Sequence, residues 1–134
     1  MLKEKDYCDY ETCVALKELG FPQDYIFARY AKVDKWVDYT SHKKGDLIVS
    51  EDRFAFTVES ESIVAPLLYE AQKWLREEKG TEIIVFSKGM VGPPYYFHVY
   101  FEDYADSDDK YYDSYEEALS EGIKSAVKEL KDNQ

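Results

Sequence analysis

The segment YYFHVYF, residues 95–101, carries the clearest strand signal in this chain of 134 residues. Aromatic and β-branched side chains make up almost all of it, and these types favour extended backbone. Successive side chains of a strand point to opposite faces of its sheet. We therefore expect one face made of Tyr95, Phe97, Val99 and Phe101, and another made of Tyr96, His98 and Tyr100. The first set is the natural core face beneath helices, so the second is predicted to form an open face.

The sequence on either side of this strand predicts its neighbours. Residues 81–87 contain an unbroken run of Ile, Val and Phe, which predicts a second strand. Residues 88–94 hold two glycines and two prolines, so we expect the chain to turn there. Ser114 and Glu117 form the S-x-x-E pattern of a capping box, which marks a helix start. Apolar residues then recur at spacings of three and four, so a helix is predicted from Ser114 onward.

Two more helices and several strands are expected earlier in the chain. Asp9 can cap a helix over Tyr10–Leu19, and Gly20 favours its end. Pro66 is expected to open a second helix that ends at Gly80, because the first helical position needs no amide hydrogen. Strands are predicted over Tyr25–Tyr30, Lys35–Thr40, Leu47–Val49 and Arg53–Glu59, with a polar loop over Ser41–Asp46.

This order of elements predicts an α+β fold. The strands come in consecutive pairs, which favours mostly antiparallel pairing. Three one-sided helices can cover one face of a sheet and give a two-layer structure. We expect a single domain over residues 1–134, with the order α-β-β-(β-β)-α-β-β-α.

The charge of the chain restricts its partners and its setting. The formal net charge is −11, and residues 102–117 hold eight acidic side chains and one lysine. No basic stripe offsets this charge, so direct nucleic-acid binding is not expected. The first eleven residues lack an apolar run, and no stretch approaches the length of a membrane span. With Cys8 and Cys13 expected to be free thiols, the predicted location is the cytoplasm.

Three segments carry a resemblance to known proteins: YETCVALKELGF at 10–21, APLLYEAQKWLREEKG at 65–80, and SYEEALSEGIKSAVKEL at 114–130. In this order they resemble small uncharacterised proteins encoded in bacterial prophages and mobile elements. The likeness covers residues 10–21, 65–80 and 95–130, and the segment from Lys32 to Ser62 departs from it. The resemblance implies a cytoplasmic, phage-associated setting. It implies no activity and no catalytic residues, because none is assigned to these proteins.

Residues 102–117, which we call the acidic segment, partly match a calcium-binding loop. Asp106, Asp108 and Glu117 have the spacing of positions one, three and twelve of an EF-hand. Lys110 and Tyr111 stand where a ligand and a glycine belong, so we expect no metal site. The chain also lacks the motifs of nucleophilic, zinc-dependent or phosphate-binding enzymes, and no catalytic residue and no cofactor are predicted.

The leading hypothesis is a non-enzymatic protein-interaction module that uses an acidic, tyrosine-rich surface. The predicted contact surface consists of Tyr96, His98, Tyr100, Tyr104, Asp106, Asp108, Asp109, Tyr111 and Tyr112. Its partner is expected to be another protein, with a second copy of the chain as one option. Two alternatives stay open. One is a nucleic-acid mimic that inhibits a host DNA-binding protein, and the other is a small ligand-binding or enzymatic domain with its site near His98.

Overall fold

The computed structural model describes most of the chain, which folds as two compact units. The C-terminal unit comprises Met1–Asp6 and Leu67–Gln134, and the N-terminal unit comprises Tyr7–Pro66. The described residues are 3–24, 28–32, 34–37, 40–49, 62–89 and 94–134.

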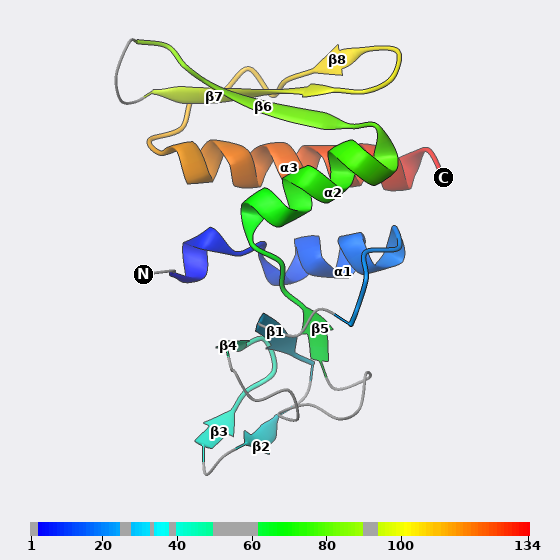
Figure 1. Ribbon diagram of the computed structural model, residues 1–134. Helices are drawn as coiled ribbons and strands as arrows, with labels where there is room; N and C mark the ends of the chain where they lie inside the picture. Colours follow the sequence, from blue (N-terminus) through cyan, green and yellow to red (C-terminus); the bar gives the residue numbers. More distant parts are fainter. Residues whose placement is uncertain (1–2, 25–27, 33, 38–39, 50–61, 90–93) are drawn as a thin grey trace. The chain divides into compact units, whose positions relative to one another are not determined.

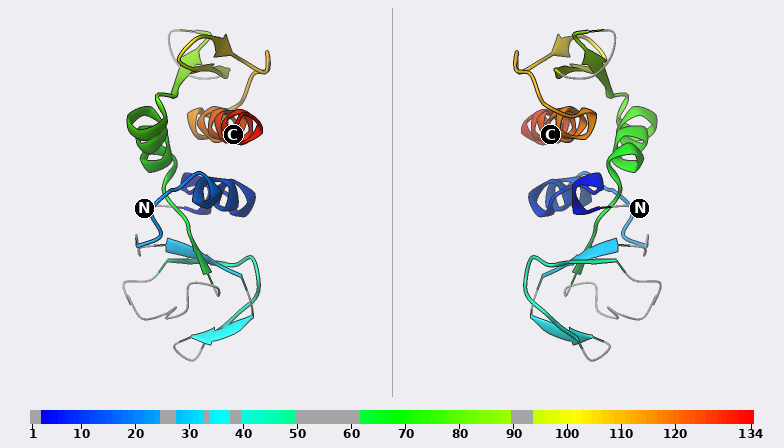
Figure 2. Two further views of the ribbon diagram at one scale, coloured as in Figure 1. Left: turned by 90° about the vertical axis from the view of Figure 1, so that its right-hand side faces the viewer. Right: turned by 90° about the vertical axis from the view of Figure 1, so that its left-hand side faces the viewer.

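The C-terminal unit is an antiparallel sheet with helices on one face (Figures 1 and 2). The sheet has the strand order β6-β7-β8, and helices α2 and α3 both pack on the same face of it. Its elements are η1 (Glu4–Asp6), α2 (Leu68–Lys79), β6 (Glu82–Ser87), β7 (Tyr95–Tyr100), β8 (Ala105–Asp106) and α3 (Tyr115–Asp132). The expected pairing of residues 81–87 with 95–101 is present, with Ile84 opposite His98 in the register.

The core of this unit depends on a close approach of α3 to the sheet. Ile83, Phe97 and Val99 point toward the helices and are at most 1% exposed. Gly122 of α3 lies directly over them: a Cβ atom there would stand 2.6 Å from Ile83 Cγ2 and 3.2 Å from the Phe97 ring. Only glycine therefore lets this turn of the helix sit so close to the two strands.

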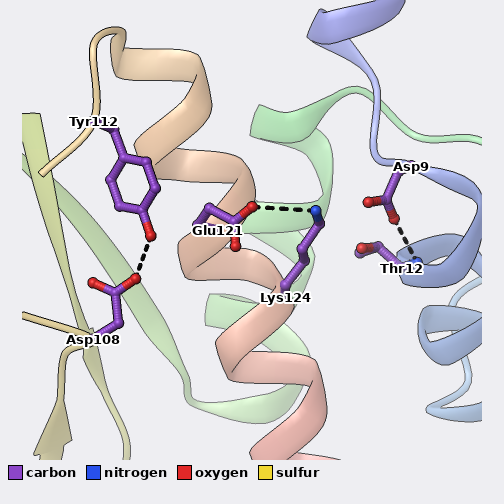
Figure 3. Close-up of polar contacts among 6 residues, drawn as sticks. All are labelled: Asp9, Thr12, Asp108, Tyr112, Glu121 and Lys124. Carbon is purple, nitrogen blue, oxygen red and sulfur yellow. Dashed lines mark hydrogen bonds and ion pairs between the residues drawn. The ribbon is translucent and has the colours of Figure 1, made fainter. Parts of the chain in front are cut away.

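The N-terminal unit has its own helix and sheets. Its elements are α1 (Tyr10–Glu18), β1 (Ala28–Ala31), β2 (Lys35–Val37), β3 (Thr40–His42), β4 (Leu47–Val49) and β5 (Ser62–Val64). One antiparallel sheet has the order β4-β1-β5, and β2 pairs with β3 in a second. The Thr12 amide donates to the Asp9 carboxylate at 2.8 Å, so Asp9 caps α1 as predicted (Figure 3). The Tyr30 hydroxyl donates to the Cys8 carbonyl at 2.7 Å, which ties β1 to the residue before this cap.

The α+β class, the antiparallel pairing and the order of elements are confirmed. The strands are divided among separate sheets, however, and the three helices do not share one sheet. The pairing is mostly local in sequence. Strand β7 has β6 on one edge and β8 on the other, while β1 lies between β4 and β5. The expected single domain over residues 1–134 stays a prediction.

Part of the predicted loop over Ser41–Asp46 is a strand. Ser41 and His42 belong to β3, because they pair with Trp36 and Lys35, so the prediction of a loop is wrong there. The predicted strand Arg53–Glu59 falls in a range that is not described.

The start of α2 differs from the prediction as well. Pro66 precedes the helix, and its carbonyl accepts from the Cys8 amide at 2.9 Å. Leu67 takes the N-cap position in extended conformation. Its amide donates to the Glu70 carboxylate at 2.9 Å, which satisfies a backbone group that the first turn would leave unpaired. The helix therefore begins at Leu68.

Replacing Gly122 with alanine is expected to destabilise the protein. The added methyl group would collide with Ile83 Cγ2, and overpacking of this kind costs about 1–3 kcal/mol. The higher helix propensity of alanine offsets up to about 1 kcal/mol of this cost. Urea unfolding should therefore give a lower free energy of unfolding for Gly122→Ala. Ser125→Ala, at a half-buried position of the same helix, is the control and should leave stability unchanged or slightly raised. A stabilised Gly122→Ala protein would contradict this packing.

Candidate protein-contact site

The sheet of the C-terminal unit has an aromatic face opposite α2 and α3, which we call the open face. It is made of Ile84, Phe86, Tyr96, His98, Tyr100 and Tyr111. Alternation along β7 separates Tyr96, His98 and Tyr100 from the buried Phe97 and Val99, as predicted. Tyr100 is 36% exposed, whereas Tyr96 and His98 are half-buried among neighbouring rings. No helix of the described part of this unit packs on this side of the sheet.

Strand β6 extends the open face with two apolar side chains. Phe86 lies opposite Tyr96 in the register, and their rings stack at a centroid distance of 5.2 Å and an interplanar angle of 17°. Phe86 also meets the His98 ring edge-on at 5.3 Å. Ile84 lies opposite His98 and is 38% exposed. The face is thus a continuous apolar and aromatic surface across both strands.

His98 is held in the middle of this surface. Its ring lies 5.6 Å from Tyr96 and 6.0 Å from Tyr100 between centroids. Its Nδ1 is 3.3 Å from the Tyr100 hydroxyl, within hydrogen-bonding distance. These contacts hold the His98 ring as a packed residue of the strand.

The acidic segment returns to the open face through Tyr111. Its ring meets Tyr96 edge-on at 5.9 Å, and it is 56% exposed. The Lys88 ammonium stands 4.9 Å from the centroid of the same ring, a cation–π contact. The segment therefore adds to the aromatic surface at one end of β7.

A shallow pocket lies between β7 and the acidic segment. Its volume is about 270 Å³, and it is lined by His98, Ala105, Asp106, Ser107 and Asp109. Both aspartates are exposed, so their carboxylates stand at its rim. The pocket joins the acidic charge to the aromatic face at His98.

Local hydrogen bonds shape the acidic segment around this pocket. The Ser107 amide donates to the Asp106 carboxylate at 2.8 Å, and the Asp109 amide donates to the Ser107 hydroxyl at 3.2 Å. The Lys110 amide donates to the Asp108 carboxylate at 3.0 Å. Asp109 has a φ of 60°, in the left-handed region that aspartate tolerates better than most residues. Short polar side chains therefore set the course of this loop.

Tyr112 and Asp108 lie on the helix-covered side of the sheet. The Tyr112 ring stacks on the core residue Phe97 at 6.3 Å, and its backbone pairs with Tyr95. Its hydroxyl donates to the Asp108 carboxylate, and Glu121 of α3 lies nearby (Figure 3). Burial, this hydrogen bond and the two negative charges raise the pKa of Tyr112. The pair therefore anchors the loop to the layer beneath it.

Tyr104 also points toward α3. Its hydroxyl donates to the Glu129 carboxylate at 2.5 Å, and its ring stacks on Phe101 at 4.8 Å. This hydrogen bond raises the pKa of Tyr104 and lowers the pKa of Glu129. Tyr104 thus fastens the turn after β7 to the last helix.

The nine residues of the predicted contact surface thus separate into two groups. The open face and the pocket beside it bring together Tyr96, His98, Tyr100, Tyr111, Asp106 and Asp109. Tyr104, Asp108 and Tyr112 instead face the helix layer and hold the loop in place. Sequence reasoning missed Ile84 and Phe86, because they lie in an unbroken apolar run that shows no alternation. Pairing that run with β7 residue by residue would have placed both on the open face.

Three further points concern the described residues alone. Among them, no cluster of three or more His, Cys, Asp or Glu side chains has the arrangement to hold a metal ion. Glu117, the last position of the calcium-loop spacing, donates its amide to the Ser114 hydroxyl at 3.1 Å, as the predicted helix cap requires. No helix in these ranges has the length and apolar character to cross a bilayer.

Comparison with known proteins finds no protein-family model, no curated protein and no solved structure that matches this chain. Inference of its function therefore rests on the geometry of its own residues.

The Tyr104–Glu129 contact predicts a measurable change in acidity. Tyr104→Phe removes the hydrogen bond that favours the charged carboxylate, so the pKa of Glu129 should rise toward its ordinary value. The stability that this group contributes is present above the ordinary glutamate pKa and is lost as the pH falls through the lowered one. A carboxyl-carbon NMR titration measures the shift. Tyr100→Phe is the control and should leave Glu129 unchanged; an unchanged titration in Tyr104→Phe would rule out this contact in solution.

Proposed function

We propose that this protein is a non-enzymatic interaction module that binds another protein through the open face and the acidic segment beside it. The observation that carries the proposal is the aromatic surface of β6 and β7, which no described helix of its unit covers. Tyrosine combines an apolar ring with a polar tip, and aromatic residues are enriched in the centres of protein interfaces. Contiguous exposed apolar surface of this kind is characteristic of binding sites.

The proposed setting is the cytoplasm of a bacterium that carries a prophage or mobile element. This part of the proposal rests on the resemblance of the three segments at 10–21, 65–80 and 114–130. Cys8 and Cys13 are both buried as thiols, which suits a reducing compartment.

The pocket at His98 favours a small-ligand site as the second candidate function. It brings a histidine and two carboxylates to one place, as a polar ligand would require. Its volume of about 270 Å³ lies just below the range of roughly 300–1,000 Å³ that is typical of small-molecule sites. It is also open, and its lining comes from one short stretch of loop and strand together with His98. These features favour contact with a protein surface over enclosure of a ligand.

Affinity capture with matched variants tests the protein-binding function. The double variant Ile84→Lys with Tyr111→Ala should lose its partner, because it places a charge in the open face and removes an exposed ring. Loss of a central contact of about 2 kcal/mol weakens binding about 30-fold. Tyr69→Ala removes an equally exposed tyrosine from α2, at 62% exposure, and should retain the partner. Retention by the open-face variant would contradict the proposal.

A second measurement identifies self-association. Light scattering at two concentrations shows whether the captured partner is another copy of this chain. In that case the open-face variant should remain monomeric at both concentrations, whereas Tyr69→Ala should associate like the parent protein.

A further inference from the structure

The acidic pocket and the aromatic open face together point to one kind of partner. We infer that this surface docks a basic segment of another protein, with an arginine side chain of that segment seated in the pocket beside His98. The inference rests on the protein-binding function proposed above and specifies the chemistry of its partner.

The size of the pocket suits a single side chain. At about 270 Å³ and open to solvent, it offers less enclosed space than sites for drug-sized molecules usually have. Its lining includes His98, Asp106 and Asp109, which supply an imidazole ring and two carboxylates. A flat group with hydrogen-bond donors along its edge would suit a ring and carboxylates at one place. Guanidinium has this shape and this set of donors.

The negative charge of the acidic segment favours binding of a basic partner over binding of an acidic protein or a second copy of this chain. Residues 102–117, which contain both rim aspartates, carry a net charge of −7 from eight acids and one lysine. A second copy would bring its own net charge of −11 toward this segment. Repulsion between like charges disfavours that pairing, whereas a basic segment would be attracted and steered toward the pocket.

One cation of the protein itself already lies against an aromatic ring of the open face. Lys88 places its ammonium over the Tyr111 ring at 4.9 Å, although it could extend into water. The face of an aromatic ring attracts cations through its quadrupole, and arginine uses this contact more often than lysine. Tyr96 and Tyr100, on either side of His98, offer further rings to a basic segment that lies along β7.

Arginine is expected in preference to lysine for a geometric reason. Its planar fork donates two parallel hydrogen bonds to a carboxylate and stacks on aromatic rings at the same time. A lysine ammonium is a point charge with a strong hydration shell and gains less from a shallow aromatic wall. The pocket presents both carboxylates and a ring, so it favours the arginine geometry.

A defined peptide series tests this inference with the full chain. The probe is a fluorescein-labelled Gly-Ser peptide with two arginines, compared with versions that carry lysine or the neutral analogue citrulline. Fluorescence anisotropy measures affinity, and NMR signals of the His98 ring report where the peptide binds. We expect the arginine peptide to bind most tightly and to shift the His98 signals, and the citrulline peptide to bind at least about tenfold more weakly.

Two charge-matched variants separate the pocket from general attraction. Asp106→Asn with Asp109→Asn removes the rim charges, while asparagine keeps the acceptor oxygen and tolerates the φ of 60° at position 109. Asp103→Asn with Asp113→Asn removes the same charge from exposed positions that do not line the pocket. The pocket variant should bind the arginine peptide about tenfold more weakly than the matched control.

The outcomes distinguish this inference from the proposal on which it rests. Equal weakening in both double variants, or equal binding of arginine and lysine peptides without His98 shifts, would overturn the arginine pocket. If the peptides do not bind but capture still depends on Ile84 and Tyr111, the inference fails and the protein-binding function stands. If the variant Ile84→Lys with Tyr111→Ala still binds the arginine peptide at the pocket, the arginine pocket is supported. Affinity capture then tests the protein-binding function on its own.

Discussion

The contact of Gly122 with Ile83 and Phe97 determines which side of the sheet can act as a surface. Because no side chain of Gly122 separates α3 from the two strands, Ile83, Phe97 and Val99 are enclosed beneath the helix. The alternating residues are then directed to the opposite face. Those outward positions also carry large aromatic side chains, Phe86 on one strand and Tyr96 on the other. A single helix position thus separates core from candidate interface.

The tyrosines of the acidic segment lie on both faces of this sheet, some on the helix side and one on the open face. Tyr104 and Tyr112 use their hydroxyl groups as donors to carboxylates on the helix side, where their protonated form is stabilised. Tyr111, next in sequence to Tyr112, turns to the open face instead. Adjacent residues of an extended segment point in opposite directions, so the pair fixes the loop on one side and presents a ring on the other.

Periodicity in the sequence was sufficient for the local parts of this fold. The alternation of residues 95–101 predicted the two faces of β7, and Asp9 and Ser114 marked the starts of two helices. Periodicity does not reveal which strand edges are occupied. Residues Ala105–Asp106 pair with β7 even though their sequence is acidic and has no strand pattern. That pairing occupies the second edge of β7 and makes it the central strand of its sheet.

The site shows the same limit in more detail. Composition correctly drew attention to residues 102–117, but it could not divide their acids by role, because aspartates within a few residues of each other look alike in sequence. The structure separates these aspartates by their hydrogen bonds and by where they lie. Asp108 receives a backbone amide and the Tyr112 hydroxyl, so its charge is used within the fold. Asp106 and Asp109 are exposed and line the pocket, although Asp106 also accepts the Ser107 amide. An acidic segment can therefore stabilise its own loop and still present carboxylates at a pocket that opens to solvent.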